Sequence, residues 1–350
     1  MPVQVDEGLL LRLADANGVT PVIARALCGM PGVSEPLRRR CETAFLAALG
    51  RRERQRAARR EIGEAASARH LPLLALKGEE IAALYADDAL RDSSDIDLAC
   101  PEERRADAGE LLRSLGYTPG ETDVNHDSYR RPPDLLIEMH HASMWQHPRL
   151  SSFFGDMWER AIPAADRGIS VLPPADRYLY LLAHAAKHLC EGGFGLRTVL
   201  DLSLARAALP REDDAYVAEG ERQMGLSLLA ARLAALAQMW FDGEEGDAAL
   251  DRFGSFLLCS GMYGTAEHRT AARRARGGSF FSRLFPSPAY MRRKYAVLGR
   301  RPWLLPLLYP YRLLRGLRRG GREAQALRTD RAVTDLVRDM LCYTGLTDDR

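Results

Sequence analysis

The sequence predicts an α+β protein in which a small mixed β-sheet lies between helical regions, and three observations support this fold class. Short apolar or alternating runs at residues 71–76, 94–99 and 135–140 have the length and period of strands. Apolar side chains at helical spacing fill most of the chain before and after these runs. At 350 residues the chain also exceeds the usual size of one hydrophobic core, so several domains are expected.

Residues 1–70 are interpreted as an N-terminal helical region, because apolar residues recur there at helical spacing on both sides of the breakers at residues 29–32. The run from Arg51 to Arg60 holds six arginines. Such a run is compatible with nucleic-acid contact, but acidic residues such as Glu53 interrupt it. We therefore favour the solvated face of a long helix.

Residues 71–145 are predicted to form the core of the protein. The apolar run at 71–76 stops at Lys77-Gly78, and residues 79–85 then have helical spacing. Gly78 is therefore expected where a strand hands over to the N-terminus of a helix. Backbone N–H groups at such a position suit a phosphate group.

Two carboxylates stand two residues apart in the next predicted strand. Alternation over residues 94–99 places Asp95 and Asp97 on one face, while Ile96 and Leu98 point into a core. Adjacent carboxylates repel each other unless a cation lies between them, and Mg²⁺ (or Mn²⁺) is the oxygen-seeking ion for such a pair. The alternative, a solvated face of a half-buried strand, is equally compatible with the spacing.

A helix is expected from Pro101 to about Leu115, followed by a polar segment and a strand over residues 135–140. Glu138 in this strand has apolar neighbours and is the third candidate carboxylate. Asp127, in the polar segment, competes for that role but lacks such neighbours. Strand alternation puts His140 on the side of Glu138, where we expect it to orient the carboxylate, and puts His141 on the opposite side.

Residues 71–142 resemble the nucleotidyltransferase superfamily that shares the polymerase-β-like fold, and more closely a poorly characterised bacterial branch of it. The resemblance rests on Lys77-Gly78 followed by Arg91-x-x-x-Asp95-Ile96-Asp97-Leu98. One departure is Gly78-Glu79 in place of the usual Gly-Ser, which removes a hydroxyl that would bind phosphate. The resemblance implies two groups of site residues, catalytic and metal-binding Asp95, Asp97 and Glu138, and nucleotide-binding Lys77, Gly78, Arg91, Ser94 and Lys187.

The same resemblance implies the activity. A nucleoside triphosphate, with ATP as the first choice, would pass its monophosphate to an acceptor hydroxyl in a reaction that needs Mg²⁺ or Mn²⁺. Two alternatives stay open at this point. One is a toxin-type enzyme that modifies tRNA or protein, and the other is a nucleotide-binding module without catalysis.

Residues 146–270 are predicted to form a helical domain, in which residues 177–189 carry a buried apolar stripe. By the resemblance, Lys187 on this helix would offer a cation to the triphosphate. His184 and His188 are four residues apart, a spacing that metal ligands use. No acid of the His-Glu-x-x-His kind accompanies them, so we interpret them as polar partners on the inner face of a cleft.

Residues 271–350 are predicted to form a basic, partly helical region. Twelve Lys or Arg residues lie between Arg292 and Arg331, against two acids. Three interpretations compete, namely an RNA-docking surface, an interfacial helix on an anionic membrane, and a fold element whose arginine stems cover apolar side chains. We favour the fold element, and hence a small molecule or polypeptide as acceptor over RNA. The reason is a set of leucines too numerous to leave in water, Leu304, Leu305, Leu307, Leu308, Leu313 and Leu314.

The composition is that of a globular protein, with a net charge of +2 and 46% hydrophobic residues. Six cysteines without paired spacing predict a reducing, cytoplasmic location and argue against a disulfide framework or a zinc site. No signal peptide opens the sequence, and no apolar run is long enough for a transmembrane segment. The sequence makes no prediction of the oligomeric state.

Overall fold

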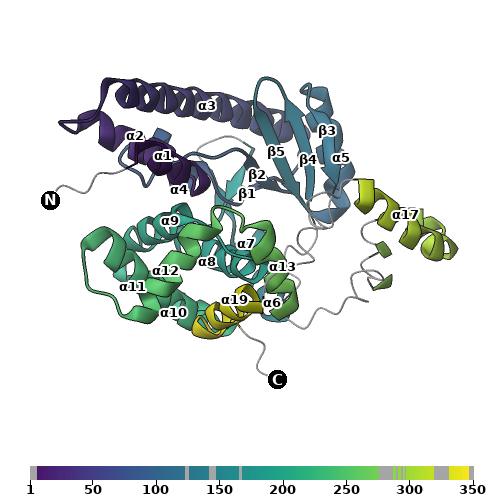
Figure 1. Cartoon of the computed structure of the whole chain (residues 1–350). Coiled ribbons are helices and arrows are strands. Elements are labelled where there is room, and N and C mark those ends of the chain that lie inside the picture. Colours follow the sequence, from purple (N-terminus) through teal and green to yellow (C-terminus); the bar gives the residue numbers. More distant parts are fainter. Residues whose placement is uncertain are drawn as a thin grey trace.

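The computed structural model describes residues 6–122, 126–141, 147–164, 168–275, 287–288, 291–292, 295, 297–318 and 331–346. A mixed β-sheet lies beside a long helix, and a helical domain packs below both of them in the view of Figure 1. This arrangement confirms the predicted α+β class. None of the described helices has the length and apolar character needed to cross a bilayer.

The sheet has seven strands in the order β3-β4-β5-β2-β1-β7-β6. Strands β2 and β5 are parallel, as are β1 and β7, while the other neighbours are antiparallel. The strands are β1 (Leu74–Ala75), β2 (Ile96–Ala99), β3 (Thr118–Thr122), β4 (His126–Arg131), β5 (Leu135–His140), β6 (Ile162–Pro163) and β7 (Ser170–Val171).

Helices α3 and α5 cover one face of the sheet, while α1 and α2 pack against the N-terminal part of α3. Ala58, Ile62 and Ala66 of α3 share a hydrophobic cluster with Leu111 and Leu112 of α5 and with the alternate residues of the central strands. The long helix α3 runs along the top of Figure 1, above α1 and α2. The helices are α1 (Glu7–Ala16), α2 (Thr20–Gly29), α3 (Glu35–Ala68) and α5 (Arg105–Ser114).

The helical domain covers the other face, where Leu74 and Ala99 belong to the larger hydrophobic cluster. Helix α8 forms the centre of that cluster, because eleven of its residues are buried. The helices of this part are α6 (Pro148–Phe153), α7 (Met157–Arg160), α8 (Pro174–Glu191), α9 (Leu196–Ala207), α10 (Asp214–Met224), α11 (Ser227–Ala237), α12 (Ala248–Ser260) and α13 (Ala266–Ala275).

The individual strands differ from the sequence expectations in length more than in place. Strand β5 has the predicted bounds, whereas only Leu74–Ala75 of the apolar run 71–76 pairs as β1. Strands β6 and β7 come from beyond residue 145, where the sequence shows no alternation long enough to predict them. Two-residue strands leave no period that a sequence pattern can reveal.

The arginine run of α3 differs from the solvated face that we expected. Arg52 and Arg59 are buried, with 6% and 4% of their surface exposed. Their guanidinium groups face the acidic residues Glu79, Glu80 and Asp88 of the segment after β1. The expectation was wrong for these two residues because it counted only acids within the helix and ignored those brought to it by the fold.

The basic C-terminal region has two parts in the described residues. Helix α19 (Arg331–Tyr343) packs against α13 and buries Val337, Met340 and Leu341 in the core of the helical domain. Helix α17 (Leu305–Arg318) instead leaves Leu307 61% exposed, so the expectation that these leucines are covered was wrong at this position. Residues 319–330 of the predicted basic segment lie outside the described residues.

Candidate functional site

The central strands place the candidate residues on the face that α8 covers. Parallel strands β2 and β5 pair in register, with Asp97 opposite Glu138 and Ala99 opposite His140. Ile96 and Leu98 point to the cluster below α3 and α5, so Asp97 must point to the other face. Alternation in β5 sends Glu138 and His140 to that same face, as the sequence predicted for His140.

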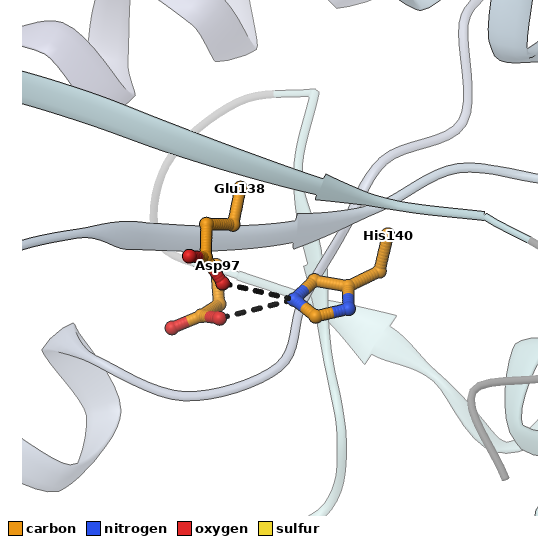
Figure 2. A group of neighbouring side chains, drawn as sticks. All are labelled: Asp97, Glu138 and His140. Atoms are coloured by element: carbon orange, nitrogen blue, oxygen red, sulfur yellow. Dashed lines mark hydrogen bonds and ion pairs between the residues drawn. The ribbon is translucent and has the colours of Figure 1, made fainter. Parts of the chain in front are cut away.

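The side chains of Asp97, Glu138 and His140 meet over the sheet (Figure 2), and one donor atom from each lies within 4.8 Å of the others. His140 Nε2 is 3.1 Å from Asp97 Oδ1 and 3.9 Å from Glu138 Oε2. Two carboxylate oxygens and one imidazole nitrogen are suitable ligands for a divalent cation. Among the described residues, Asp95 is not part of this compact group.

Asp97 is almost fully buried and holds two nitrogen partners. Lys77 Nζ lies 3.1 Å from Asp97 Oδ2, and His140 occupies the other oxygen. Burial by itself would raise the pKa of Asp97, but the Lys77 charge and the His140 contact outweigh it and hold the pKa below the usual range. The carboxylate therefore stays ionised.

Glu138 has a different environment, although it is Asp97's neighbour across the strands. Burial raises the pKa of Glu138 to about 7, and the negative charges of Asp97 and Asp95 add to this effect. Its shortest ion contacts, to His126 and His140, are both 3.9 Å long. A carboxyl group with a pKa near neutrality can accept and release a proton under ordinary conditions.

Asp95 lies just before β2 at the edge of this site. Ser93 Oγ donates to Asp95 Oδ1 over 3.1 Å, while neighbouring Ser94 is exposed. The Asp95 charge acts on the pKa of both Lys77 and Glu138, which places it close to the two residues. Asp95 precedes β2 and is half-buried, whereas Asp97 is buried within the strand, so the predicted common face of the two carboxylates stays a prediction.

The Lys77-Gly78 turn lies beside the acids, as the sequence predicted. Gly78 has a φ of 117°, a value that side chains with a Cβ rarely adopt, and it precedes the short helix α4 (Glu79–Ala82). A Cβ at Gly78 would meet nothing within 4 Å. The backbone is therefore open to a ligand, and together Lys77, Gly78 and Asp95 line a small depression under α3.

Glu79, which stands where the resembled family has serine, is bound by helix α3. Arg56 Nε donates to Glu79 Oε1 over 3.0 Å, and Arg52 and Arg59 approach the carboxylate within 3.7 and 3.9 Å. These contacts of Glu79 attach the Lys77-Gly78 turn to α3. This contact explains the departure from the Gly-Ser pattern in physical terms.

Arg91 does not point to the acids in the way that its predicted nucleotide-binding role requires. It is 5% exposed, and its Nε and Nη2 atoms donate to Asp201 of α9 over 2.9 and 2.8 Å. Tyr85 Oη donates to the same carboxylate over 2.7 Å. The geometry assigns Arg91 to a buried ion pair between the segment before β2 and the helical domain, and corrects the prediction.

Helix α8 presents a row of rings to the site. The Tyr180 and His184 rings are stacked 6.2 Å apart, and His188 Nε2 lies 3.3 Å from His184 Nε2. Burial lowers the pKa of both histidines, and the Lys77 charge lowers it further. The two neutral imidazoles contact each other on α8, and a cleft beside them stays a prediction.

Two cations of the helical domain, Lys187 and Arg197, have different contacts near the site. Lys187 forms no ion pair with any described residue, and its charge acts on His184 and His188. Arg197, at the start of α9, donates to the backbone oxygen of Asp92, and its charge acts on the pKa of Lys77. Arg197 is therefore the helical-domain cation beside the Lys77 turn, a residue that no sequence motif indicated.

Asp127, the competing third carboxylate, lies on the opposite face of the sheet. Arg105 donates to both of its oxygens over 2.7 Å, and His141 approaches it within 3.6 Å. Asp127 pairs with Met139 across β4 and β5, and residues that face each other across a sheet share one side. Glu138 is thus the third acid that the fold brings to Asp97.

Other residues near the site escaped sequence analysis as well. Tyr263, which follows α12, lies close enough to Asp95 that burial and this charge together raise the pKa of its hydroxyl. Burial raises the pKa of the Tyr180 hydroxyl as well, and the charges of Asp97 and Glu138 raise it further. Neither tyrosine belongs to a spacing pattern, so only the packing of the helical domain against the sheet reveals them.

One protein family and one solved structure are similar to this chain. The profile of a protein family described as "Uncharacterised nucleotidyltransferase" matches residues 4–242. Among solved structures, the antibiotic-resistance factor ANT(2'')-Ia, known from a solution structure, is 20% identical with a TM-score of 0.35. That match covers 51% of this chain and 92% of the other. No curated protein matches the sequence.

Proposed function

This chain belongs to the family of uncharacterised nucleotidyltransferases, and on that premise we propose that it is a Mg²⁺-dependent enzyme that transfers a nucleoside monophosphate from a nucleoside triphosphate to an acceptor hydroxyl. ATP is the first nucleotide to test. A small molecule or a polypeptide is the favoured acceptor. Mn²⁺ is expected to replace Mg²⁺, because both ions bind oxygen ligands.

One observation carries the proposal, namely the in-register approach of Asp97 and Glu138 from parallel strands with His140 beside them. Hard oxygen donors in this arrangement fit a divalent cation. Asp97 and Glu138 would hold it, with Asp95 at the open side. When bound, the cation supplies positive charge to phosphate oxygens and lowers the pKa of an acceptor hydroxyl.

The other roles in the reaction, proton acceptance and charge stabilisation, are assigned to side chains of the protein. The acceptor oxygen would attack the α phosphorus, the bond to pyrophosphate would break, and the acceptor proton would pass to Glu138 beside the attacking hydroxyl. We assign the stabilisation of the negative charge that grows on pyrophosphate to Lys77, which pairs with Asp97, and to Arg197, whose charge acts on Lys77. Arg91 has no part in this proposal.

The helical domain would provide the wall opposite the sheet. Tyr180, His184 and His188 present rings and neutral imidazoles to the acids from α8. Such groups can pack against a base or a sugar and can exchange hydrogen bonds with hydroxyl groups. We therefore place the bound substrate between α8 and strands β2 and β5.

Calorimetry tests the first half of the proposal. The protein is titrated with each nucleoside triphosphate in the presence of Mg²⁺ and then in EDTA. We expect binding only with the metal, and an affinity that EDTA leaves unchanged would contradict a carboxylate–metal site. The matched variant is Glu138→Gln, which keeps the shape of the side chain and removes its charge.

A labelling experiment tests the second half. The protein is incubated with triphosphates labelled at the α phosphorus and with cell extract, which is then separated into RNA, protein and small-molecule fractions. Label is expected in the small-molecule or protein fraction and should be absent with Glu138→Gln. Label in RNA that disappears as salt rises would contradict the favoured acceptor class.

A further inference from the structure

Helix α17 and the turn before it carry an apolar face that no described part of the protein covers. Trp303, Leu307 and Tyr311 are 68%, 61% and 50% exposed. They are spaced four residues apart, so the helical period brings them to one side, and Pro306 and Pro310 between them are exposed as well. Figure 1 shows α17 projecting at the edge of the molecule.

Only one sign of charge accompanies this apolar face. Residues 297–318 contain five arginines and no acidic residue. Arg301 is exposed next to Trp303, and Arg312, Arg315 and Arg318 belong to the later turns of α17. An exposed apolar face within a segment of this sequence charge is complementary to an apolar partner that carries negative charge.

We propose that α17 and the preceding turn dock this protein on the surface of a membrane that contains anionic lipids. The 14 residues of α17 are too few to span a bilayer, so the helix would lie in the plane of the interface. Tryptophan and tyrosine are the side chains that favour the headgroup region, and arginine is attracted by anionic headgroups. This inference concerns location and does not depend on the proposed reaction.

The composition of the face favours lipid over RNA. Single-stranded RNA is bound by aromatic side chains that stack on bases within a basic groove. Between Trp303 and Tyr311 the exposed positions are Leu307 and the two prolines, while Tyr309 is partly buried, so aliphatic side chains separate the two exposed rings. Aliphatic side chains between aromatic ones instead suit insertion between acyl chains.

Vesicle sedimentation with the full-length protein tests the inference. One set of vesicles is phosphatidylcholine alone, and the other contains about 30% phosphatidylglycerol to supply the negative surface potential. We expect binding to the anionic vesicles that weakens as salt rises, and little binding to the neutral ones. Replacing Arg301→Gln should reduce the anionic binding about fivefold, the loss expected for one basic residue near the surface.

The decisive variant is Leu307→Glu, with Leu46→Glu as its matched control. Leu46 lies on α3 and is 64% exposed, against 61% for Leu307, so both changes place a carboxylate on an exposed helical position. Leu307→Glu should reduce binding to anionic vesicles by at least about tenfold, because it removes an inserted side chain and adds repulsion. Leu46→Glu should leave binding unchanged, and both variants should keep the melting temperature of the parent.

Fluorescence gives an independent readout. The emission of the parent should shift to shorter wavelength on anionic vesicles as Trp303 leaves water, and Trp303→Phe should remove most of that shift. Equal vesicle binding by the parent and Leu307→Glu would overturn the inference. RNA binding without lipid binding would also overturn it, as would a dimer that Leu307→Glu dissociates while vesicles bind neither form.

Discussion

Asp97 shows how a predicted metal ligand is held when only protein atoms surround it. Lys77 and His140 each occupy one of its oxygens at 3.1 Å. The two nitrogens stabilise a carboxylate that is almost entirely removed from water. Each carboxylate oxygen keeps a further lone pair, so a cation can bind Asp97 beside Lys77 and His140.

Asp97→Asn should destabilise the protein without metal as well as abolish transfer. The amide leaves the Lys77 ammonium, only 16% exposed, without its counter-charge. Removing one partner of a buried pair typically costs about 3–5 kcal/mol, and the incomplete burial of Lys77 places this case at the lower end. Urea denaturation in EDTA measures the change. The double variant Lys77→Met/Asp97→Asn should recover part of the loss, and an unchanged stability of Asp97→Asn would contradict the pairing.

Glu138→Gln is the cleaner test of catalysis. Among the described residues Glu138 has no ion contact shorter than 3.9 Å, so removal of its charge leaves none of them as a buried partner without a counter-charge. We expect transfer to fall by at least about a hundredfold, the usual contribution of a positioned general base, while the melting temperature is preserved. Glu110→Gln, on the exposed side of α5, is the control and should retain full activity.

The raised pKa of Glu138 predicts a pH dependence of stability in EDTA. Its pKa is 4.5 in the unfolded chain and about 7 in the folded protein, so the folded state binds this proton more tightly. The stabilisation from this group is complete below pH 4.5 and is lost as pH rises through about 7. Melting temperatures across this range should show the loss in the parent protein. The curve for Glu138→Gln should lack this component, and two parallel curves would contradict the assignment.

At the scale of elements, the Arg91–Asp201 pair connects the segment before β2 to helix α9. Its two partners are 5% and 4% exposed, so water cannot replace a lost contact. Arg91 also lies four residues before Asp95 along the chain. Its physical role is therefore to hold the segment before β2 against the helical domain.

Asp201→Ala should cost about 3–5 kcal/mol, because it leaves the Arg91 guanidinium buried without a partner. The double variant Arg91→Met/Asp201→Ala should cost less, since it removes both charges. The exposed pair of Arg206 and Asp214 provides the control, and Asp214→Ala should change stability by less than about 1 kcal/mol. Chemical denaturation compares the three variants. Similar losses for Asp201→Ala and Asp214→Ala would mean that burial does not decide the strength of the first pair.

At the scale of the whole molecule, the C-terminal region contributes one covered helix and one exposed helix. Helix α19 closes the core of the helical domain against α13, whereas the apolar face of α17 lies in solvent. Helix α19 begins at the last residue of the predicted basic segment 292–331, so it does not test the fold-element interpretation, which the exposed Leu307 contradicts at one position. Where the core domain ends along the chain stays a prediction, although strands β6 and β7 extend the sheet beyond residue 145.

Truncation to alanine should change the free energy of unfolding by very different amounts at two leucines of this region. Leu341→Ala should destabilise the protein by about 2–5 kcal/mol, because the side chain is 2% exposed and leaves a cavity. Leu307→Ala, at 61% exposure, should change stability by less than about 0.5 kcal/mol. Thermal and chemical denaturation measure both variants. A large loss for Leu307→Ala would mean that a part of the protein covers α17 in solution.

The sequence by itself determined the local features of the site. Period-two alternation is a property of a single strand, so the common face of Asp95 and Asp97 and the common face of Glu138 and His140 could be predicted without knowing their partners. The same holds for Gly78, because a strand-to-helix junction is marked by adjacent residues. The α+β class followed from the order of such segments.

Only the tertiary structure decided which charges meet. Asp201 lies 110 residues from Arg91, and Arg52 lies 36 residues from Asp88, so no local period connects either pair. The roles of Arg91, Arg197 and the arginines of α3 depend on those distant partners. Exposure of α17 is decided in the same way, because an apolar helix is covered or left in water according to what the rest of the chain places against it.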